Sequence, residues 1–299
     1  MMDMSRASRL FRGRRRAEVA LEIHYRSTDA DGVVWYEVRS PHNGPSAHFL
    51  RVLPPTNPAP GVAHNFLYAL PVQPEQRTTY GDGLETLLDL GAHDRYNVTI
   101  IVPSFAVDPW YADNANDPSR RYESFMTKDL VPWVTRNLAL TGHEQNWLLG
   151  FSKSGYGAAT LLLRNPDVFA SAASFDFPAR MASYKDFERS SKRVYGTNAN
   201  FQANYRMTHS FVNTRKAPFL TKNRIWIGGG ETFPEHVDDY DALLTEVGIA
   251  HTAAISEPIP HVWHGGWVPT ALQALSLQGS ALAGMHEPAR SSARALRSE

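Results

Sequence analysis

A doubly wound α/β fold with a mostly parallel sheet is the fold class that the sequence predicts. After residue 60, short apolar segments alternate with longer amphipathic ones, which is the pattern of parallel strands joined by helices. The chain of 299 residues is 42% apolar and has no net charge, as expected of a globular protein of one large domain. No internal repeat is present.

The first elements form a short β segment ahead of the alternating part. Two strand-like runs, residues 19–25 and 33–40, flank Asp31-Gly32, and this spacing predicts a β-hairpin. Prolines then punctuate residues 54–60. The basic run before the hairpin, Arg9 to Arg16, is followed by no apolar segment, so we expect no signal peptide and a cytoplasmic protein.

The alternating part predicts strands at 64–70, 97–105, 146–151, 169–177, 224–230 and 252–259 and helices at 83–92, 119–140, 156–165, 237–249 and 267–280. Pro132 is expected to bend the helix at 119–140. We expect one domain over 17–285, with a lid-like insertion at about 179–223 and disordered tails at 1–16 and 286–299.

Ser152 stands between a predicted strand and a predicted helix. A nucleophilic serine on a strained strand-to-helix turn has the pattern G-x-S-x-G, because small neighbours let the two backbones approach closely. This chain has Gly150 and Ser152 but carries Ser154 in place of the last glycine, with Gly155 and Gly157 following. The sequence therefore predicts Ser152 as a nucleophile, with an ordinary glycine-rich turn as the alternative.

The stretch GFSKSGYGAATLLLRNPDVF resembles the elbow of the α/β-hydrolase superfamily, and most of all its putative-esterase branch. That branch includes esterase D, feruloyl esterases and mycolyltransferases, in which the stretch typically reads G-H-S-M-G-G-Y-G-A. The resemblance extends more weakly over residues 66–272. It implies an α/β-hydrolase fold and a triad in the chain order serine, acid, histidine.

The base is expected just after the last strand, where His261 and His264 both occur. The family's histidine, aromatic, Gly-Trp pattern favours His261. Family members carry the acid after the strand at 224–230, which favours Glu231 as the carboxylate that holds the imidazole Nδ1–H. The alternatives are Asp176, which ends the strand after the elbow, and Asp238 and Asp239.

Backbone N–H groups are needed to hold the oxyanion of an acyl-transfer reaction. The amide of Lys153 is one candidate, and that of Val72 or Gln73 is the other, because Pro71 has no N–H. The Lys153 side chain is expected to be solvated. Trp110 and Tyr111 are expected either to line the substrate pocket or to pack under the long helix.

The insertion at 179–223 is basic. It contains nine Lys and Arg residues and only two acidic residues, Asp186 and Glu188, so its local charge is +7. This charge suggests attraction of an anionic group on the substrate, although a solvated surface is the default.

These features predict a serine esterase that acts on a small-molecule ester through Ser152, His261 and Glu231. An acyltransferase with the same triad and a non-catalytic binding protein remain alternatives. The chain has no cysteine for a thiolate metal site, and IGGGE lacks dinucleotide-fingerprint spacing, so we expect no metal and no cofactor. We expect no membrane partner because no apolar run approaches the roughly 20 residues of a span, and no nucleic acid because the basic runs are typical of solvated segments.

Overall fold

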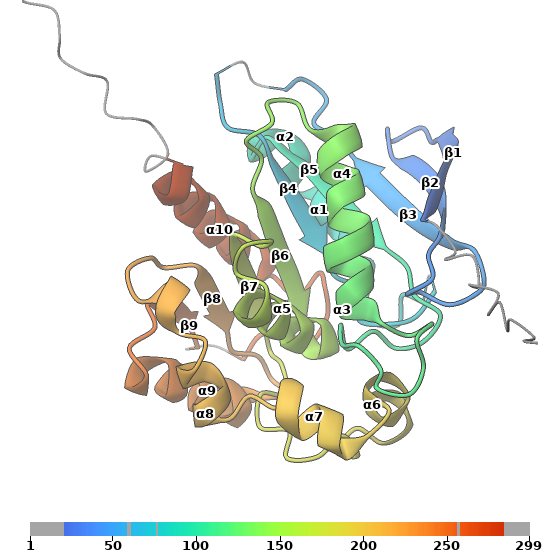
Figure 1. The fold of residues 1–299 in the computed structure, drawn as a ribbon. Coiled ribbons are helices and arrows are strands. Elements are labelled where there is room, and N and C mark those ends of the chain that lie inside the picture. The colour runs from blue at the N-terminus through green and yellow to red at the C-terminus, as the bar shows by residue number, and fades with distance from the viewer. Residues whose placement is uncertain (1–20, 59–60, 76, 256–257, 284–299) are drawn as a thin grey trace, which may run out of the picture.

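The computed structural model describes residues 21–58, 61–75, 77–255 and 258–283 (Figure 1). Within them, one sheet of nine strands has the order β1-β2-β3-β5-β4-β6-β7-β8-β9. The strands are β1 (Glu22–Thr28), β2 (Val34–Arg39), β3 (His48–Leu53), β4 (Asn65–Ala69), β5 (Val98–Pro103), β6 (Asn146–Phe151), β7 (Ser171–Phe175), β8 (Ile225–Gly228) and β9 (His251–Ala254). The predicted tails, 1–16 and 286–299, lie outside the described residues.

The first strands are antiparallel and the rest are parallel. β1 pairs with β2, β2 with β3, and β3 with β5, all antiparallel. The hairpin predicted at Asp31-Gly32 is confirmed, because Gly32 takes a φ of +80° and Asp29 Oδ1 accepts the N–H of Val33 at 2.9 Å. From β4 to β9 the pairings are parallel. The predicted mostly parallel sheet with a short N-terminal β segment is confirmed.

Helices cover both faces of the sheet (Figure 1). They are α1 (Gly83–Asp89), α2 (Ala92–Arg95), α3 (Tyr122–Ser124), α4 (Val131–Leu138), α5 (Ser152–Arg164), α6 (Glu188–Tyr195), α7 (Asn198–Asn204), α8 (His209–Asn213), α9 (Pro234–Glu246) and α10 (Val268–Ala283), with a 3₁₀ turn, η2 (Ala217–Phe219). One apolar layer includes residues of α1, α2 and α10, and the other includes residues of α3 to α5 and α9.

The central strands are buried on both faces and divide their side chains between the two layers. In β4, Leu67 and Ala69 belong to the layer with α10, whereas Phe66 and Tyr68 belong to the layer with α5. Alternation of this kind follows from the two-residue period of a strand. It explains why these strands read as continuous apolar runs in the sequence.

The long helix predicted at 119–140 is interrupted. A π-helical segment, η1 (Phe125–Leu130), lies between α3 and α4 and ends two residues before Pro132. Because proline has no N–H to donate to the fourth preceding carbonyl, the backbone there is free to widen. The predicted effect of Pro132 therefore takes the form of a π segment rather than a simple bend.

The parallel strands bring the ends of β6, β7 and β8 to one edge of the sheet. Phe151 pairs with Phe175 and Phe175 with Gly228, so Ser152, Asp176 and Gly229 all leave the sheet there. Ligand sites of open α/β sheets lie outside the carboxyl ends of the strands. The fold therefore places the predicted nucleophile where such sites occur.

Candidate active site

Ser152 occupies a strained turn between β6 and α5. Its φ is +53°, in the left-handed region that non-glycine residues seldom adopt. A Cβ on Gly150 would lie 2.5 Å from the carbonyl oxygen of Ser154, and one on Gly155 would lie 3.1 Å from that of Phe175. These close approaches are the physical reason for the small residues around Ser152 in the sequence.

Ser154 accounts for the departure from the usual motif. Its side chain is fully buried and bonds to one residue of β6: the hydroxyl donates to the carbonyl of Phe151 at 2.9 Å and accepts the Phe151 N–H at 3.1 Å. The extra hydroxymethyl group therefore anchors the first turn of α5 to the end of β6. The substitution is compatible with the elbow.

Asp176 holds the imidazole of His261. Its Oδ2 lies 2.6 Å from His261 Nδ1, and its side chain has no solvent exposure. The carboxylate also accepts the backbone N–H groups of Thr232 at 3.1 Å and Phe233 at 2.6 Å. Asp176 has a φ of +40°, and its carbonyl accepts the N–H of Ser152 at 3.2 Å, so the elbow and the acid are joined through the backbone.

The prediction that Glu231 holds the Nδ1–H of the imidazole is wrong, because Asp176 makes that contact. Glu231 is exposed, and its Oε1 accepts the backbone N–H of His261 at 3.3 Å rather than the ring N–H. Its own N–H donates to the carbonyl of Ile259 at 3.1 Å. Asp238 is exposed on α9, and Asp239 pairs with Arg180 at 3.0 Å. Among these four carboxylates, Asp176 is therefore the one that contacts the His261 ring.

The two candidate histidines lie in different surroundings. His261 contacts Phe151 of the elbow, with ring centroids 5.1 Å apart. His264 is exposed, and its side chain packs against the turn that precedes α1: a Cβ placed on Gly81 would lie 2.9 Å from His264 Nδ1. The choice of His261 over His264 therefore agrees with the contacts.

The two amides expected to hold an oxyanion flank the elbow. α5 begins at Ser152, so the N–H of Lys153 is one of the first-turn N–H groups that lack a carbonyl partner within the helix. β4 runs parallel beside β6, and Leu70 donates to the carbonyl of Leu149 at 2.8 Å. Val72, two residues further on, therefore leaves the sheet next to the elbow.

The Lys153 side chain is paired rather than solvated. Its Nζ lies 3.1 Å from Asp108 Oδ1, and the side chain is only 19% exposed. The pair ties the elbow to the loop after β5. Asp108 is not predictable from the sequence, because its partner is 45 positions away and no local pattern joins the two.

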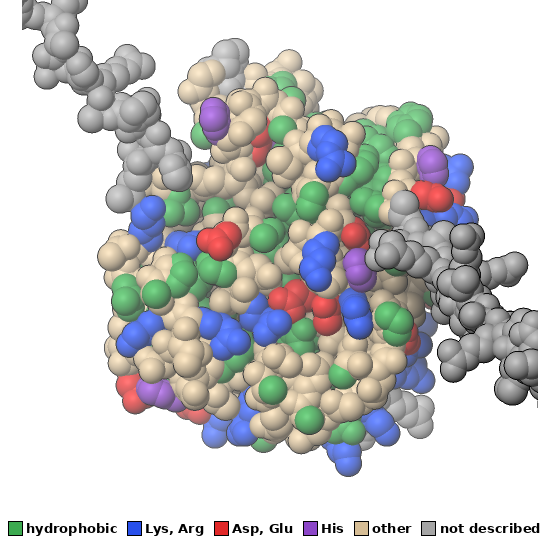
Figure 2. Space-filling view, viewed as in Figure 1, with side chains coloured by type: hydrophobic (Ala, Val, Ile, Leu, Met, Phe, Trp, Pro, Cys, Tyr) green, Lys and Arg blue, Asp and Glu red, His purple; other side chains and the backbone are tan. Residues whose placement is uncertain are grey.

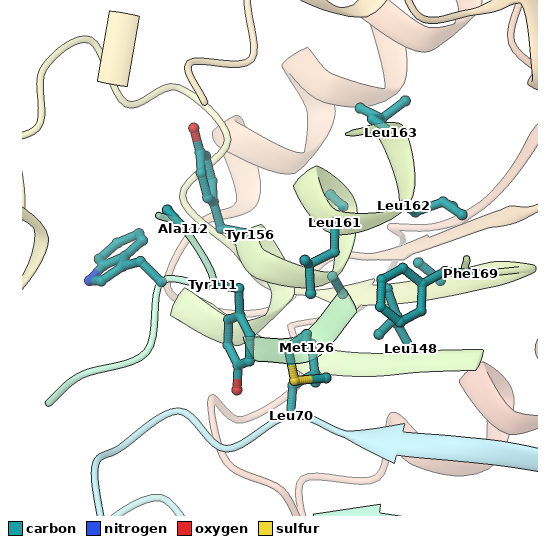
Figure 3. Close-up of a cluster of buried hydrophobic side chains, with 14 of the residues drawn as sticks. Leu70, Tyr111, Ala112, Met126, Leu148, Tyr156, Leu161, Leu162, Leu163 and Phe169 are labelled. Atoms are coloured by element: carbon teal, nitrogen blue, oxygen red, sulfur yellow. The ribbon is translucent and has the colours of Figure 1, made fainter. Parts of the chain in front are cut away.

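Trp110 and Tyr111 do not line an open pocket. Both side chains are fully buried, and Figure 3 shows Tyr111 directed toward Leu70 and Met126. Burial raises the pKa of the Tyr111 phenol well above its usual value, and the phenol donates to the carbonyl of Pro71 at 2.8 Å. A Cβ on Gly157 would lie 2.2 Å from the Tyr111 ring, so that glycine makes room for the ring. Both aromatic residues therefore serve packing.

One arginine of the basic insertion, Arg180, is paired with carboxylates of α9. Figure 2 shows Lys and Arg side chains spread over the lower part of the face where α7 and α8 lie, with Asp and Glu among them. Arg180 pairs with Glu235 at 3.3 Å and with Asp239 at 3.0 Å, and the guanidinium of Arg215 lies 4.0 Å from the centre of the Phe211 ring. The two carboxylates reduce the charge that Arg180 presents to an anionic substrate group, whereas the contact of Arg215 with a neutral ring leaves its charge unchanged.

No helix among the described residues is long and apolar enough to cross a membrane. Within that same part of the chain, no group of three or more His, Asp or Glu side chains is placed to hold a metal ion.

Comparison with known proteins identifies the family of the chain. Residues 51–244 match the family model described as putative esterase, which is more than half of the chain. The chain belongs to this family. MPT51 antigen of Mycobacterium leprae is 30% identical to the chain over 98 residues, which cover 32% of this chain and 30% of that protein. The matched stretch thus spans about a third of the length of this curated relative.

Solved structures of related folds agree with the assignment. S-formylglutathione hydrolase from Agrobacterium tumefaciens superposes with a TM-score of 0.61 at 14% identity, covering 85% of this chain and 99% of that one. The serine hydrolase FphF of Staphylococcus aureus gives 0.65 at 17% identity, covering 82% and 97%. At these identities the likeness shows the fold, and the predicted α/β-hydrolase fold of the putative-esterase branch is confirmed.

Proposed function

We propose that this protein hydrolyses a carboxylic ester through Ser152, His261 and Asp176. The observation that carries the proposal is the 2.6 Å contact between His261 Nδ1 and a fully buried Asp176, next to a serine held at positive φ. A carboxylate in that position fixes the tautomer in which Nδ1 carries the proton and Nε2 is free to accept one. Membership of the putative esterase family supports the reaction class.

The reaction proceeds in two halves. Ser152 Oγ attacks the ester carbonyl carbon while His261 Nε2 accepts the hydroxyl proton, and the backbone N–H groups of Lys153 and Val72 stabilise the oxyanion. The intermediate collapses, the C–O bond to the alcohol breaks, and His261 returns the proton to the leaving oxygen. Water then attacks the acyl-enzyme with the same general base and releases the acid. The Asp176 carboxylate keeps the ring oriented and stabilises the imidazolium that forms.

A fluorophosphonate probe followed by peptide mapping tests this proposal. We expect an adduct on Ser152 in the wild type, none in Ser152→Ala, and a strongly reduced rate of labelling in His261→Ala. His264→Ala is the matched control, since it removes an exposed histidine from the same loop, and it is expected to label normally. Folded wild-type protein that neither reacts nor hydrolyses p-nitrophenyl acetate would contradict the proposal.

The substrate in this proposal is a small-molecule ester. The cytoplasmic location and the anionic substrate group expected from the sequence stay predictions.

A further inference from the structure

Three aromatic rings surround the imidazole of His261. The centroids of Phe151, Phe233 and Tyr80 lie 5.1, 5.6 and 6.0 Å from that of the imidazole. Phe151 is fully buried beneath the elbow. Tyr80 is 39% exposed and Phe233 is partly exposed, so these two rings present surface beside the imidazole.

The backbone of each residue that carries an exposed ring is hydrogen-bonded to the site. The carbonyl of Tyr80 accepts the N–H of Trp263, two residues after His261, at 2.9 Å. The N–H of Phe233 donates to Asp176 at 2.6 Å, and its ring contacts Phe187 of the insertion at 5.9 Å. The Phe233 ring packs against both Phe187 and His261, and a ring ordered before binding costs less entropy on association than one that must be ordered.

The positions of Tyr80 and Phe233 beside His261 place them near the alcohol part of an ester substrate. In ester cleavage the base returns its proton to the leaving oxygen, so the leaving alcohol lies within hydrogen-bond reach of His261 Nε2. The carbonyl oxygen points toward the amides of Lys153 and Val72. Side chains that touch the imidazole therefore flank the alcohol part of the ester.

We propose that Tyr80 and Phe233 determine specificity for the leaving group, and that the preferred substrates are esters of aromatic alcohols. This inference rests on the proposed hydrolysis. Rings meet edge to face in proteins because the electropositive edge of one attracts the electronegative face of another. Tyr80 and Phe233 already contact the imidazole at interplanar angles of 87° and 67°, and an aromatic alcohol would join the same cluster.

Matched esters test the preference. The wild type is assayed with three acetates, ethyl, 2-phenylethyl and 2-cyclohexylethyl, whose alcohols have similar leaving ability. A fourth ester, ethyl 3-phenylpropanoate, carries the ring on the acyl side instead. We expect kcat/KM for the phenylethyl ester to exceed that for ethyl acetate by about tenfold. The cyclohexyl ester should fall between the two, and the acyl-side ring should gain less than the alcohol-side ring.

Variants identify the residues responsible. Tyr80→Ala and Phe233→Ala should each lower the phenylethyl-to-ethyl ratio by about threefold, while Tyr80→Phe should keep it. Tyr25→Ala is the control, because Tyr25 is an exposed tyrosine on β1, the outermost strand on the N-terminal side of the sheet, which is not adjacent to β6, β7 or β8. The ratio, rather than the rate, is the readout, since a displaced His261 would slow all esters equally.

Three results would overturn the inference while leaving the hydrolase proposal standing: equal rates for phenylethyl and ethyl acetate, equal rates for the phenyl and cyclohexyl esters, or variants that slow every ester without changing the ratio. Failure of the proposed function looks different, since then Ser152 takes no fluorophosphonate and no ester is turned over.

Discussion

The loops after β7 and β8 each place a carboxylate near His261, and the two carboxylates differ in what surrounds them. Asp176 is fully buried and accepts two backbone N–H groups besides the imidazole. Glu231 is exposed and accepts the backbone N–H of His261 at 3.3 Å. The order of the residues along the chain did not decide which carboxylate contacts the His261 imidazole. Burial and fixed backbone donors did, because the two N–H groups of the β8 loop hold the Asp176 carboxylate in one orientation against the ring.

The largest expected effect separates these two carboxylates directly. Asp176→Asn should lower kcat by roughly 10³- to 10⁴-fold, because an amide stabilises the wrong imidazole tautomer. Glu231→Gln should change kcat by less than about threefold, since its exposed contact with a backbone N–H is weak and the amide oxygen still accepts it. Steady-state kinetics on a p-nitrophenyl ester measure both. The opposite ranking would restore Glu231 as the acid.

A glycine in the β8 loop limits the room for Asp176. A Cβ on Gly230 would lie 2.5 Å from Asp176 Oδ2, so Gly230→Ala should displace the carboxylate and lower kcat/KM by about 10²-fold. Gly229→Ala is the matched control, because its Cβ would meet Ile255 at 3.2 Å instead. If Gly230→Ala were as active as Gly229→Ala and the wild type, Asp176 would tolerate displacement of its carboxylate.

Glu144 is a third carboxylate that accepts backbone N–H groups, in the turn before β6. Burial of its carboxyl opposes ionisation, but the N–H groups of Thr141 and Leu140 outweigh it and lower the pKa from 4.5 to about 2. A lowered folded-state pKa adds stability above the unfolded value, and this contribution is lost as the pH falls from about 4.5 toward 2.

Glu144→Gln should therefore lower the free energy of unfolding at pH 7 by about 2 kcal/mol and leave catalysis unchanged. The difference between variant and wild type should shrink as the pH falls through that window, as read from urea denaturation. Glu85→Gln, an exposed glutamate on α1, is the control. A pH-independent difference would mean that packing, not charge, is responsible.

The smallest effect concerns the elbow to which Asp176 is bonded. Ser154→Ala should lower the free energy of unfolding by about 1 kcal/mol, because the two bonds to Phe151 are lost. Activity should change by less than about threefold, since φ at Ser152 is set by the glycine contacts. A large loss of activity with normal stability would instead give Ser154 a part in holding the nucleophile.

Local pattern was enough to predict the strands β4 to β8, the hairpin and the elbow, whereas β3 (His48–Leu53) was not predicted as a separate strand. Each depends on residues close in the chain: the apolar runs of β4 to β8, Asp31-Gly32, and Gly150, Ser152 and Gly155. His261 was also within reach, because it follows the last strand and precedes a recognisable Gly-Trp. The π segment before Pro132 shows the limit, since proline predicts a disturbance but not its form.

The sequence by itself determined that Ser152 would stand at the carboxyl edge of a parallel sheet, because hydrophobic period and small residues act locally. The tertiary structure decided which carboxylate meets His261 and which aromatic rings face the site. Asp176 lies 85 positions from His261, Trp110 and Tyr111 are buried, and Tyr80 and Phe233 keep part of their surface exposed. These outcomes depend on the packing of distant loops, and burial is a property of the folded chain rather than of the residue.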